Sequence, residues 1–111
     1  MTTQEILEAA RRAKTAVALA DSQTRKQALL GMADQLCHPE NMEAILAANA
    51  EDMAAAKGHI SDVMLDRLAL TEERIGAMAR SILEVAALPD PVGRVLKRVE
   101  RPNGLVIEKT A

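Results

Sequence analysis

The chain has 111 residues, a net charge of -2 and no aromatic side chain. Its charges of both signs are scattered, which excludes a basic stripe for nucleic acid, and no apolar run approaches the roughly 20 residues of a membrane span. The first residues lack the apolar stretch of a signal peptide, and one cysteine permits no internal disulfide, so we expect a cytoplasmic protein of one domain or less.

The hydrophobic content of 49% is ordinary in amount but unusual in kind. Much of it is alanine, which favours helix formation and buries little apolar area. Larger apolar side chains come only from Leu, Ile, Val and six Met. We therefore expect thin helical layers that need a partner surface, and a low stability for the isolated chain.

Two helices are predicted at the start of the chain. Thr2 and Glu5 match a capping box for the first, which should run to about Ala20. Asp21 or Ser22 offers the N-cap of the second, which should end near residue 37. Each helix has an apolar stripe that we expect to be buried. The two stripes are Ile6, Ala10, Ala13 and Val17, and Leu29, Met32, Ala33 and Leu36.

The middle of the chain predicts one long or two shorter helices. Pro39 suits a first helical turn, because it has no amide hydrogen to lose there. Asn49 is a point at which that helix could be capped or kinked. The alanine-rich stretch 51–57 is helical by propensity, and Gly58 is placed to end it in a left-handed conformation.

Two further helices bring the expected number to about five or six. Ser61 restarts the helical pattern for a short apolar helix, and Thr71 caps the last helix, which should run to about residue 87. We expect their apolar positions to be buried. These positions are Val63, Met64, Leu65, Leu68 and Leu70, and Ile75, Met78, Ala79, Ile82 and Val85.

The periodicity changes after Pro89 and Pro91, which cannot continue a helix. Residues 95–100 predict a strand in which Val95, Lys97 and Val99 alternate with Leu96, Arg98 and Glu100. Asn103 and Gly104 match the commonest two-residue hairpin turn, and a second strand follows to residue 110. An isolated hairpin is marginal in water. We therefore expect residues 89–111 to join a sheet supplied by other sequence or by another subunit. The chain is thus expected to be the N-terminal part of a larger protein, with a helical part at residues 1–88.

Few side chains are available for chemistry, and no catalytic, cofactor-binding or metal-binding residue is predicted. Cys37 precedes His38, but neighbouring helical residues point about 100° apart, and the end of a helix is its negative pole, which disfavours a thiolate. With His59 they lack the paired spacing of zinc ligands. Gly93 and Gly104 stand alone, without a glycine-rich phosphate loop. We interpret the cysteine as structural or incidental and His59 as a loop residue.

The acidic side chains are explained as helix caps or solvated helix faces. Those considered for acid–base catalysis are Glu51, Asp52, Asp62 and Asp66. Asp66 and Arg67 lie within an otherwise apolar helix, so we expect one of them to be partly buried in a structural pair rather than to act in catalysis.

Four short blocks occur in a characteristic order. They are Ala-Asn-Ala-Glu-Asp at 48–52, Met-Leu-Asp-Arg-Leu-Ala-Leu-Thr at 64–71 with Arg74 and Ile75, Asp-Pro-Val-Gly at 90–93, and Arg-Pro-Asn-Gly-Leu at 101–105. Each block alone has a local explanation as a cap or a turn. Together they resemble the N-terminal part of the gamma-glutamyl phosphate reductase family, also called glutamate-5-semialdehyde dehydrogenase, over nearly the whole chain.

The resemblance implies part of a larger α/β fold of the aldehyde-dehydrogenase type. It implies an enzyme of proline biosynthesis that reduces L-glutamyl 5-phosphate with NADPH to L-glutamate 5-semialdehyde, through a thioester on a catalytic cysteine. That cysteine lies later in the family's sequence and Cys37 does not match it, so this chain alone should be inactive. Residues 1–88 would belong to the cofactor-binding domain, and 89–111 resembles the oligomerisation arm, with the rest of the enzyme or a neighbouring subunit as its partner.

Two alternatives stay open on the residues alone. The first is a non-enzymatic helical interaction module whose hairpin docks on another protein. The second is another aldehyde-dehydrogenase-like reductase with a different acyl substrate, since the residues that select the substrate are not among the four blocks.

Overall fold

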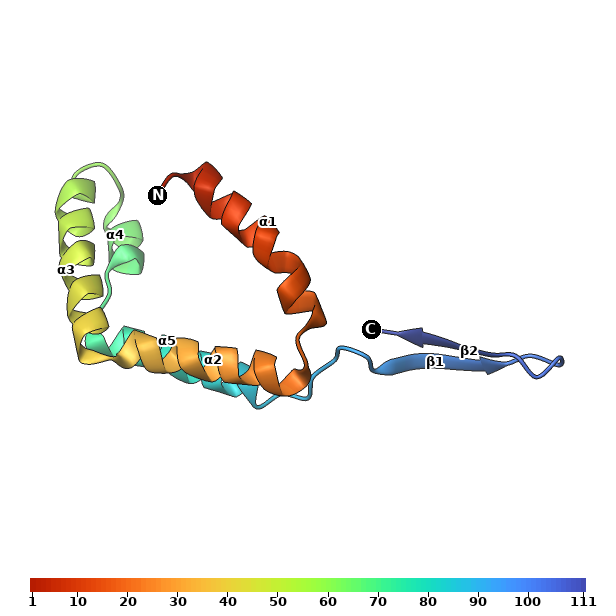
Figure 1. Ribbon diagram of the computed structural model, residues 1–111. Coiled ribbons are helices and arrows are strands. Elements are labelled where there is room, and N and C mark those ends of the chain that lie inside the picture. Colours follow the sequence, from red (N-terminus) through yellow and green to blue (C-terminus); the bar gives the residue numbers. More distant parts are fainter. The chain divides into compact units, whose positions relative to one another are not determined.

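The computed structural model describes residues 1–111 as five helices followed by a two-stranded antiparallel sheet (Figure 1). The elements are α1 (Thr3–Leu19), α2 (Ser22–Cys37), α3 (Pro39–Ala56), α4 (Asp62–Leu68), α5 (Glu72–Ala86), β1 (Val95–Glu100) and β2 (Val106–Thr110). The prediction of a mainly helical chain that ends in a hairpin is confirmed. Two compact units make up the chain: Met1–Arg25 with Leu88–Ala111, and Lys26–Ala87.

The helices begin where the sequence predicts, and most of them are capped by a nearby side chain. Thr2 and Glu5 form the capping box of α1, in which each side chain bonds to the backbone amide of the other residue. Asp21 accepts a hydrogen bond from the amide of Thr24 at 2.7 Å and so caps α2. Pro39 occupies the first turn of α3. Ser61 and Thr71 cap α4 and α5.

The long helix α3 corrects the expectation at Asn49. It runs unbroken from Pro39 to Ala56, so most of the alanine-rich stretch continues α3 rather than forming a helix of its own. The Asn49 side chain bonds to another segment, 19 and 21 residues further on, so it does not compete for its own helix backbone. Gly58 follows with a φ of +84°, as the sequence predicts.

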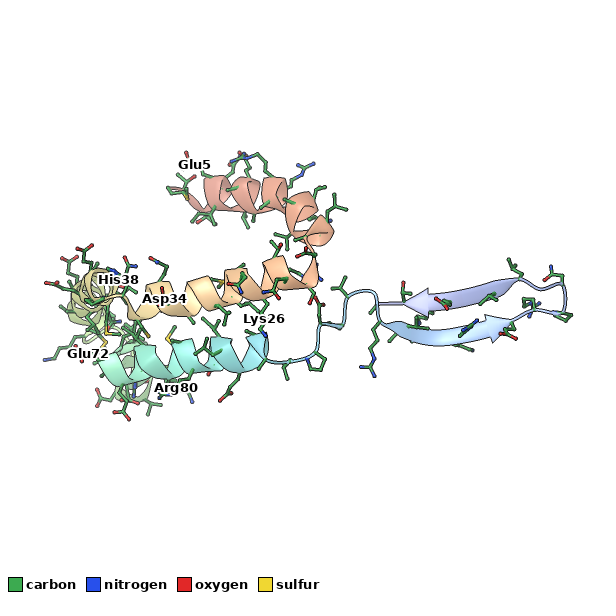
Figure 2. All side chains as sticks on the ribbon, turned by 60° about the horizontal axis from the view of Figure 1, so that its bottom comes forward. Glu5, Lys26, Asp34, His38, Glu72 and Arg80 are labelled. Carbon is green, nitrogen blue, oxygen red and sulfur yellow. The ribbon has the colours of Figure 1, made fainter.

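All buried side chains belong to the unit Lys26–Ala87. Ile75 of α5 is only 1% exposed, and it is the one large side chain that is fully buried. The others are Ala33, Ala79 and Ala86. The two helices that carry them, α2 and α5, lie side by side (Figures 1 and 2), and α3 contacts both α4 and α5. Because alanine fills little volume, this core is thin.

Several positions expected to be buried are exposed. No residue of α1 is buried, and Ile6 and Val17 are both more than half exposed. About half to two-thirds of each of the following side chains is also exposed: Met32, Val63, Met64, Met78 and Val85. Periodicity identifies the apolar face of a helix, but burial requires a second element against that face, and residues 1–111 supply few of these.

The hairpin pairs β1 with β2 across its whole length. Opposite residues are Lys97 and Lys109, Arg98 and Glu108, Val99 and Ile107, and Glu100 and Val106. The register shifts between Val95 and Lys97, where an extra residue interrupts the ladder. None of its side chains is buried.

The hairpin turn differs from the predicted two-residue turn. The Arg101 amide donates to the Leu105 carbonyl at 2.7 Å, and the Gly104 amide donates to the Arg101 carbonyl at 2.9 Å, so the loop has three residues. Gly104 has a φ of +87°, but Asn103 does not have the positive φ that the predicted turn requires. Pro102 explains the difference, because its fixed φ near −65° suits the first central position of a type I turn.

None of the five helices is both long enough and apolar enough to cross a lipid bilayer.

Candidate functional site

The cysteine and the two histidines weighed for chemistry lie at helix ends and in a turn, whereas the exposed Glu51 and Asp52 lie within α3 and the exposed Asp62 begins α4. Cys37 is the last residue of α2 and is exposed. His38 is the N-cap residue of α3 but makes no side-chain capping bond, and the exposed His59 lies in the turn after α3. No three His, Cys, Asp or Glu side chains come together in a group that could hold a metal ion.

Asp66 takes part in an ion pair, as expected, but it is not buried. The Arg74 guanidinium lies 3.3 Å from its carboxylate. The Asp66 side chain is 74% exposed, which makes the expectation of partial burial wrong. Arg74 also donates to the backbone carbonyl of Ala69 at 2.7 Å. Its guanidinium therefore ties the end of α4 to the first turn of α5.

Asn49 holds the same connection from the side of α3. Its Nδ2 donates to the carbonyl of Leu68 at 2.9 Å, and its Oδ1 accepts from the amide of Leu70 at 2.8 Å. One side-chain amide thus satisfies two backbone groups that neither α4 nor α5 can satisfy. Together with Arg74, it fixes residues 66–70, immediately before the Thr71 cap.

A second polar contact lies in the unit of Met1–Arg25 and Leu88–Ala111. Arg25 Nη2 is 2.5 Å from Asp90 Oδ2, and both side chains are about three-quarters buried. Arg25 also donates to the Ala20 carbonyl, and Asp90 Oδ1 accepts from the amide of Val92 at 2.9 Å. The hydrogen bond from Arg25, followed by that from Val92, holds the pKa of Asp90 below its ordinary value.

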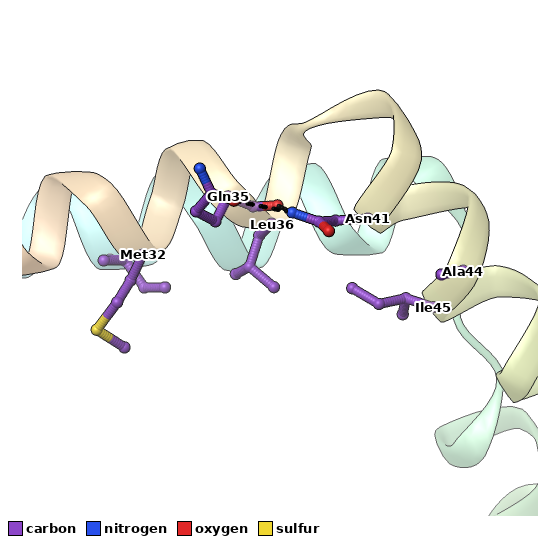
Figure 3. Close-up of a pocket in the computed structure, with 7 residues that line it drawn as sticks. Met32, Gln35, Leu36, Asn41, Ala44 and Ile45 are labelled. Carbon is purple, nitrogen blue, oxygen red and sulfur yellow. Dashed lines mark hydrogen bonds between the residues drawn. The ribbon is translucent and has the colours of Figure 1, made fainter.

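A largely apolar groove of about 460 Å³ opens between α2 and α3 (Figure 3). Asn41 crosses one side of it and donates to the carbonyl and side-chain oxygens of Gln35, at 2.9 and 3.0 Å. The other lining residues are Met32, Leu36, Ala44, Ile45 and Ile82. No titratable side chain lines the groove, so it suits an apolar group and offers no acid or base.

The charged side chains of the hairpin divide between its two faces. Because opposite residues of an antiparallel pair share a face, Arg98 lies with Glu108, and their charged groups are 4.0 Å apart. Arg98 also lies 3.6 Å from Glu100, two residues away on the same face. On the other face Lys97 stands opposite Lys109.

Comparison with known proteins gives one consistent result, although no family model matches the chain. Gamma-glutamyl phosphate reductases of two Streptococcus pneumoniae strains, Hungary19A-6 and CGSP14, are 57% identical to it over 106 residues. The aligned part covers 96% of this chain and 25% of each enzyme. The chain therefore spans about a quarter of the length of the curated relatives it matches.

Two solved structures share the fold. The gamma-glutamyl phosphate reductase of Thermotoga maritima is 32% identical with a TM-score of 0.82, over 90% of this chain and 24% of that one. The enzyme of Saccharomyces cerevisiae is 33% identical with a TM-score of 0.81, over 97% of this chain and 28% of that one.

The family-like blocks contain the residues that make these structural contacts. Asn49 belongs to the first block and bonds to residues of the second, while Asp90 belongs to the third. Their partners were missed because a contact over 65 residues, such as that of Arg25 with Asp90, leaves no local sequence signal. Over nearly its whole length the chain is thus a homologue of the N-terminal quarter of gamma-glutamyl phosphate reductase.

Proposed function

We propose that the chain is the N-terminal quarter of a cytoplasmic, NADPH-dependent reductase that converts L-glutamyl 5-phosphate into L-glutamate 5-semialdehyde in proline biosynthesis. The observation that carries this proposal is the 57% identity to the pneumococcal reductase over 96% of the chain. The shared fold of the two solved reductases, with TM-scores of 0.82 and 0.81, supports it.

The direct roles of residues 1–111 in such an enzyme are helix packing and donation of the hairpin. These residues do not fit the phosphates of a nicotinamide cofactor, because both strands belong to the hairpin and neither leads into a helix through a glycine-rich loop. No step of the reaction is therefore derived from them. Cofactor binding and the nucleophile are assigned to the other three-quarters of the enzyme.

The sequence identity argues against one of the two alternative functions but not against the other. A helical module without enzyme ancestry does not account for 57% identity that extends over 106 residues of a reductase. A reductase with a different acyl substrate shares the same scaffold, and only an assay separates it from the proposed enzyme.

A chimera tests the proposal directly. Residues 1–111 of this chain replace the aligned quarter of the pneumococcal enzyme, which is 57% identical to this chain over 106 residues. The chimera is assayed in the reverse direction with L-glutamate 5-semialdehyde, phosphate and NADP, and we expect a rate within about tenfold of the parent, a loss of about 1.4 kcal/mol of transition-state stabilisation at most. The 111-residue chain alone should show no turnover.

Two results would contradict the proposal. One is a folded chimera without this activity, which would show that the segment cannot serve in the reductase. The other is turnover by the isolated chain, which would place the chemistry in residues for which no role has been found. Acetaldehyde and succinate semialdehyde, assayed in parallel, reveal a different acyl preference.

A further inference from the structure

The ion pair between Arg25 and Asp90 is the best buried one of the chain. Its two side chains are 24% and 22% exposed, whereas every other ion pair has a partner that is at least 58% exposed. The pair also joins residues that are 65 positions apart in the sequence. Withdrawing two charges from water is costly unless each charge finds further hydrogen bonds, so the other partners of these two side chains indicate what the pair holds together.

The Arg25 guanidinium binds two segments at once. Its Nη1 donates to the carbonyl of Ala20, the residue that ends α1, and its Nη2 donates to Asp90. The arginine is itself held in the first turn of α2, where its amide donates to the Asp21 carbonyl at 3.1 Å. Because the guanidinium is rigid and planar, the end of α1 and the segment that precedes the hairpin are held in a fixed relation to it.

Asp90 uses its two carboxylate oxygens for different partners. Oδ2 faces Arg25, and Oδ1 accepts from the amide of Val92 at 2.9 Å, which closes a turn of the Asx type. A second turn follows at once, in which the Arg94 amide donates to the Pro91 carbonyl at 3.1 Å. The chain therefore turns twice within residues 90–94, directly after the carboxylate that the arginine holds.

The hairpin root, which we define as Gly93, Arg94 and Ala111, begins in this double turn. The Gly93 amide donates to the Ala111 carbonyl at 2.9 Å, and the Ala111 amide donates to the Arg94 carbonyl at 3.0 Å. These two bonds extend the ladder between β1 and β2 toward the turn, and neither involves the ion pair. No side chain of this unit is buried, so apolar packing does not hold the root closed. Its geometry depends on the turn at 90–94.

We propose that Arg25 is a positioning residue that acts through Asp90: by holding this carboxylate against the end of α1, it orders the turn 90–94 and keeps the hairpin root closed. This role does not depend on the proposed function, because every group that takes part lies in the unit of Met1–Arg25 and Leu88–Ala111. Without the guanidinium, Asp90 keeps only its local bond to Val92. The root then opens, while the outer part of the hairpin stays paired through its own ladder.

Amide exchange in the 111-residue chain tests this role, because NMR of the isotope-labelled protein resolves each amide separately. Arg25→Gln should speed exchange at Gly93 and Ala111 by about tenfold, although neither amide bonds to the arginine. The Arg101 amide, at the other end of the hairpin, should change by less than about twofold. Arg94→Gln is the matched control, since Arg94 is an exposed arginine of the same segment that forms no ion pair.

Two further variants establish whether Arg25 acts through Asp90. Asp90→Asn keeps an acceptor for the Val92 amide but removes the charged oxygen that faces the arginine. Arg25→Gln, Asp90→Asn and the double variant should therefore speed exchange at the root by the same factor, because the two residues act as one unit. Arg25→Lys should rescue part of the protection, with a rise of about threefold, since an ammonium group still reaches the carboxylate but lacks the rigid fork that also binds Ala20.

Several outcomes would overturn the proposal. Unchanged exchange at Gly93 and Ala111 in the Arg25→Gln variant, or an equal rise in the Arg94→Gln variant, would show that the guanidinium does not order the root. Additive effects in the double variant would show that Arg25 acts without Asp90. An equal rise at Arg101 would mean general unfolding of the hairpin, and root amides that exchange in the original chain as fast as in a free peptide would mean that the root is open from the start.

Discussion

The helical unit Lys26–Ala87 and the hairpin are stabilised in different ways. The helical unit contains every buried side chain, together with the side-chain bonds of Asn49 and Arg74 to backbone carbonyls. The hairpin has a nearly complete ladder of backbone hydrogen bonds but no buried side chain. Backbone bonds define local structure, whereas burial of apolar surface supplies most stability. The helical unit should therefore resist unfolding more than the hairpin.

The largest effect is expected for Ile75→Ala. Ile75 is the one large side chain that is fully buried, so truncation should lower the free energy of unfolding of the helical unit by about 2–4 kcal/mol. Urea unfolding of the 111-residue chain, followed by circular dichroism at low temperature, measures the loss. Val85→Ala in the same helix is the control, because Val85 is 54% exposed. Equal effects of both substitutions would show that α5 has no real core.

Asn49→Ala should weaken the helical unit by about 1–2 kcal/mol, because it leaves the Leu68 carbonyl and the Leu70 amide without their partner. Asn49→Asp separates the two bonds, since a carboxylate still accepts from Leu70 but repels the Leu68 carbonyl. Amide exchange at Leu70 reports the difference. It should be fast in the alanine variant and partly protected in the aspartate variant, whereas equal protection in all three proteins would exclude the anchoring role.

Replacement of two glycines by alanine should have opposite effects in the helical unit and in the hairpin, stabilising the first and destabilising the second. Gly31 lies inside α2 with no atom near the position of an added Cβ, so Gly31→Ala should stabilise the helical unit by about 0.5–1 kcal/mol. Gly104 has a φ of +87°, so Gly104→Ala should strain the hairpin turn by about 1–2 kcal/mol. Urea unfolding measures the first change, and faster exchange of the Arg101 amide measures the second. Stabilisation of the turn by Gly104→Ala would contradict its observed conformation.

Features set by neighbours in sequence were predictable. Thr2, Ser61 and Thr71 cap helices because a hydroxyl reaches an amide three residues on, and the apolar spacing gave the type of each element. Burial was not predictable in the same way. Ile75 and Val85 belong to the same predicted apolar pattern in α5, yet one is 1% and the other 54% exposed, while Ala86, next to Val85, is 7% exposed. At 3.6 residues per turn Val85 lies about 80° around the helix from Ile75 and Ala86 about 20°, so Val85 lies at the edge of the buried stripe.

The long-range contacts of Asn49 and Asp90 and the type of the hairpin turn were not predictable from the sequence, for different reasons. Asn49 and Asp90 contact residues 19 to 65 positions away, and no local spacing marks such pairs. The Asn103–Gly104 pair favours a two-residue turn, but the ring of Pro102 fixes φ at the position before the pair and selects a three-residue loop instead. The four blocks pointed to the right family because they combine these local and distant constraints in one order.

The smallest effect concerns pH and the Arg25–Asp90 pair. Hydrogen bonds from Arg25 and from the Val92 amide favour the carboxylate, so the pKa of Asp90 in the folded protein lies below its ordinary value of 3.8. A lowered folded-state pKa means that the pair stabilises its unit at pH values above 3.8, and that this contribution is lost as the pH falls through the lowered pKa. Arg25→Gln removes the largest cause, so the pKa of Asp90 should rise toward 3.8, as followed by the carboxyl carbon shift in NMR. Arg80→Gln, in the other unit, should leave that titration unchanged, and identical Asp90 titrations in the Arg25 variant and the original chain would show that the pair does not persist in solution.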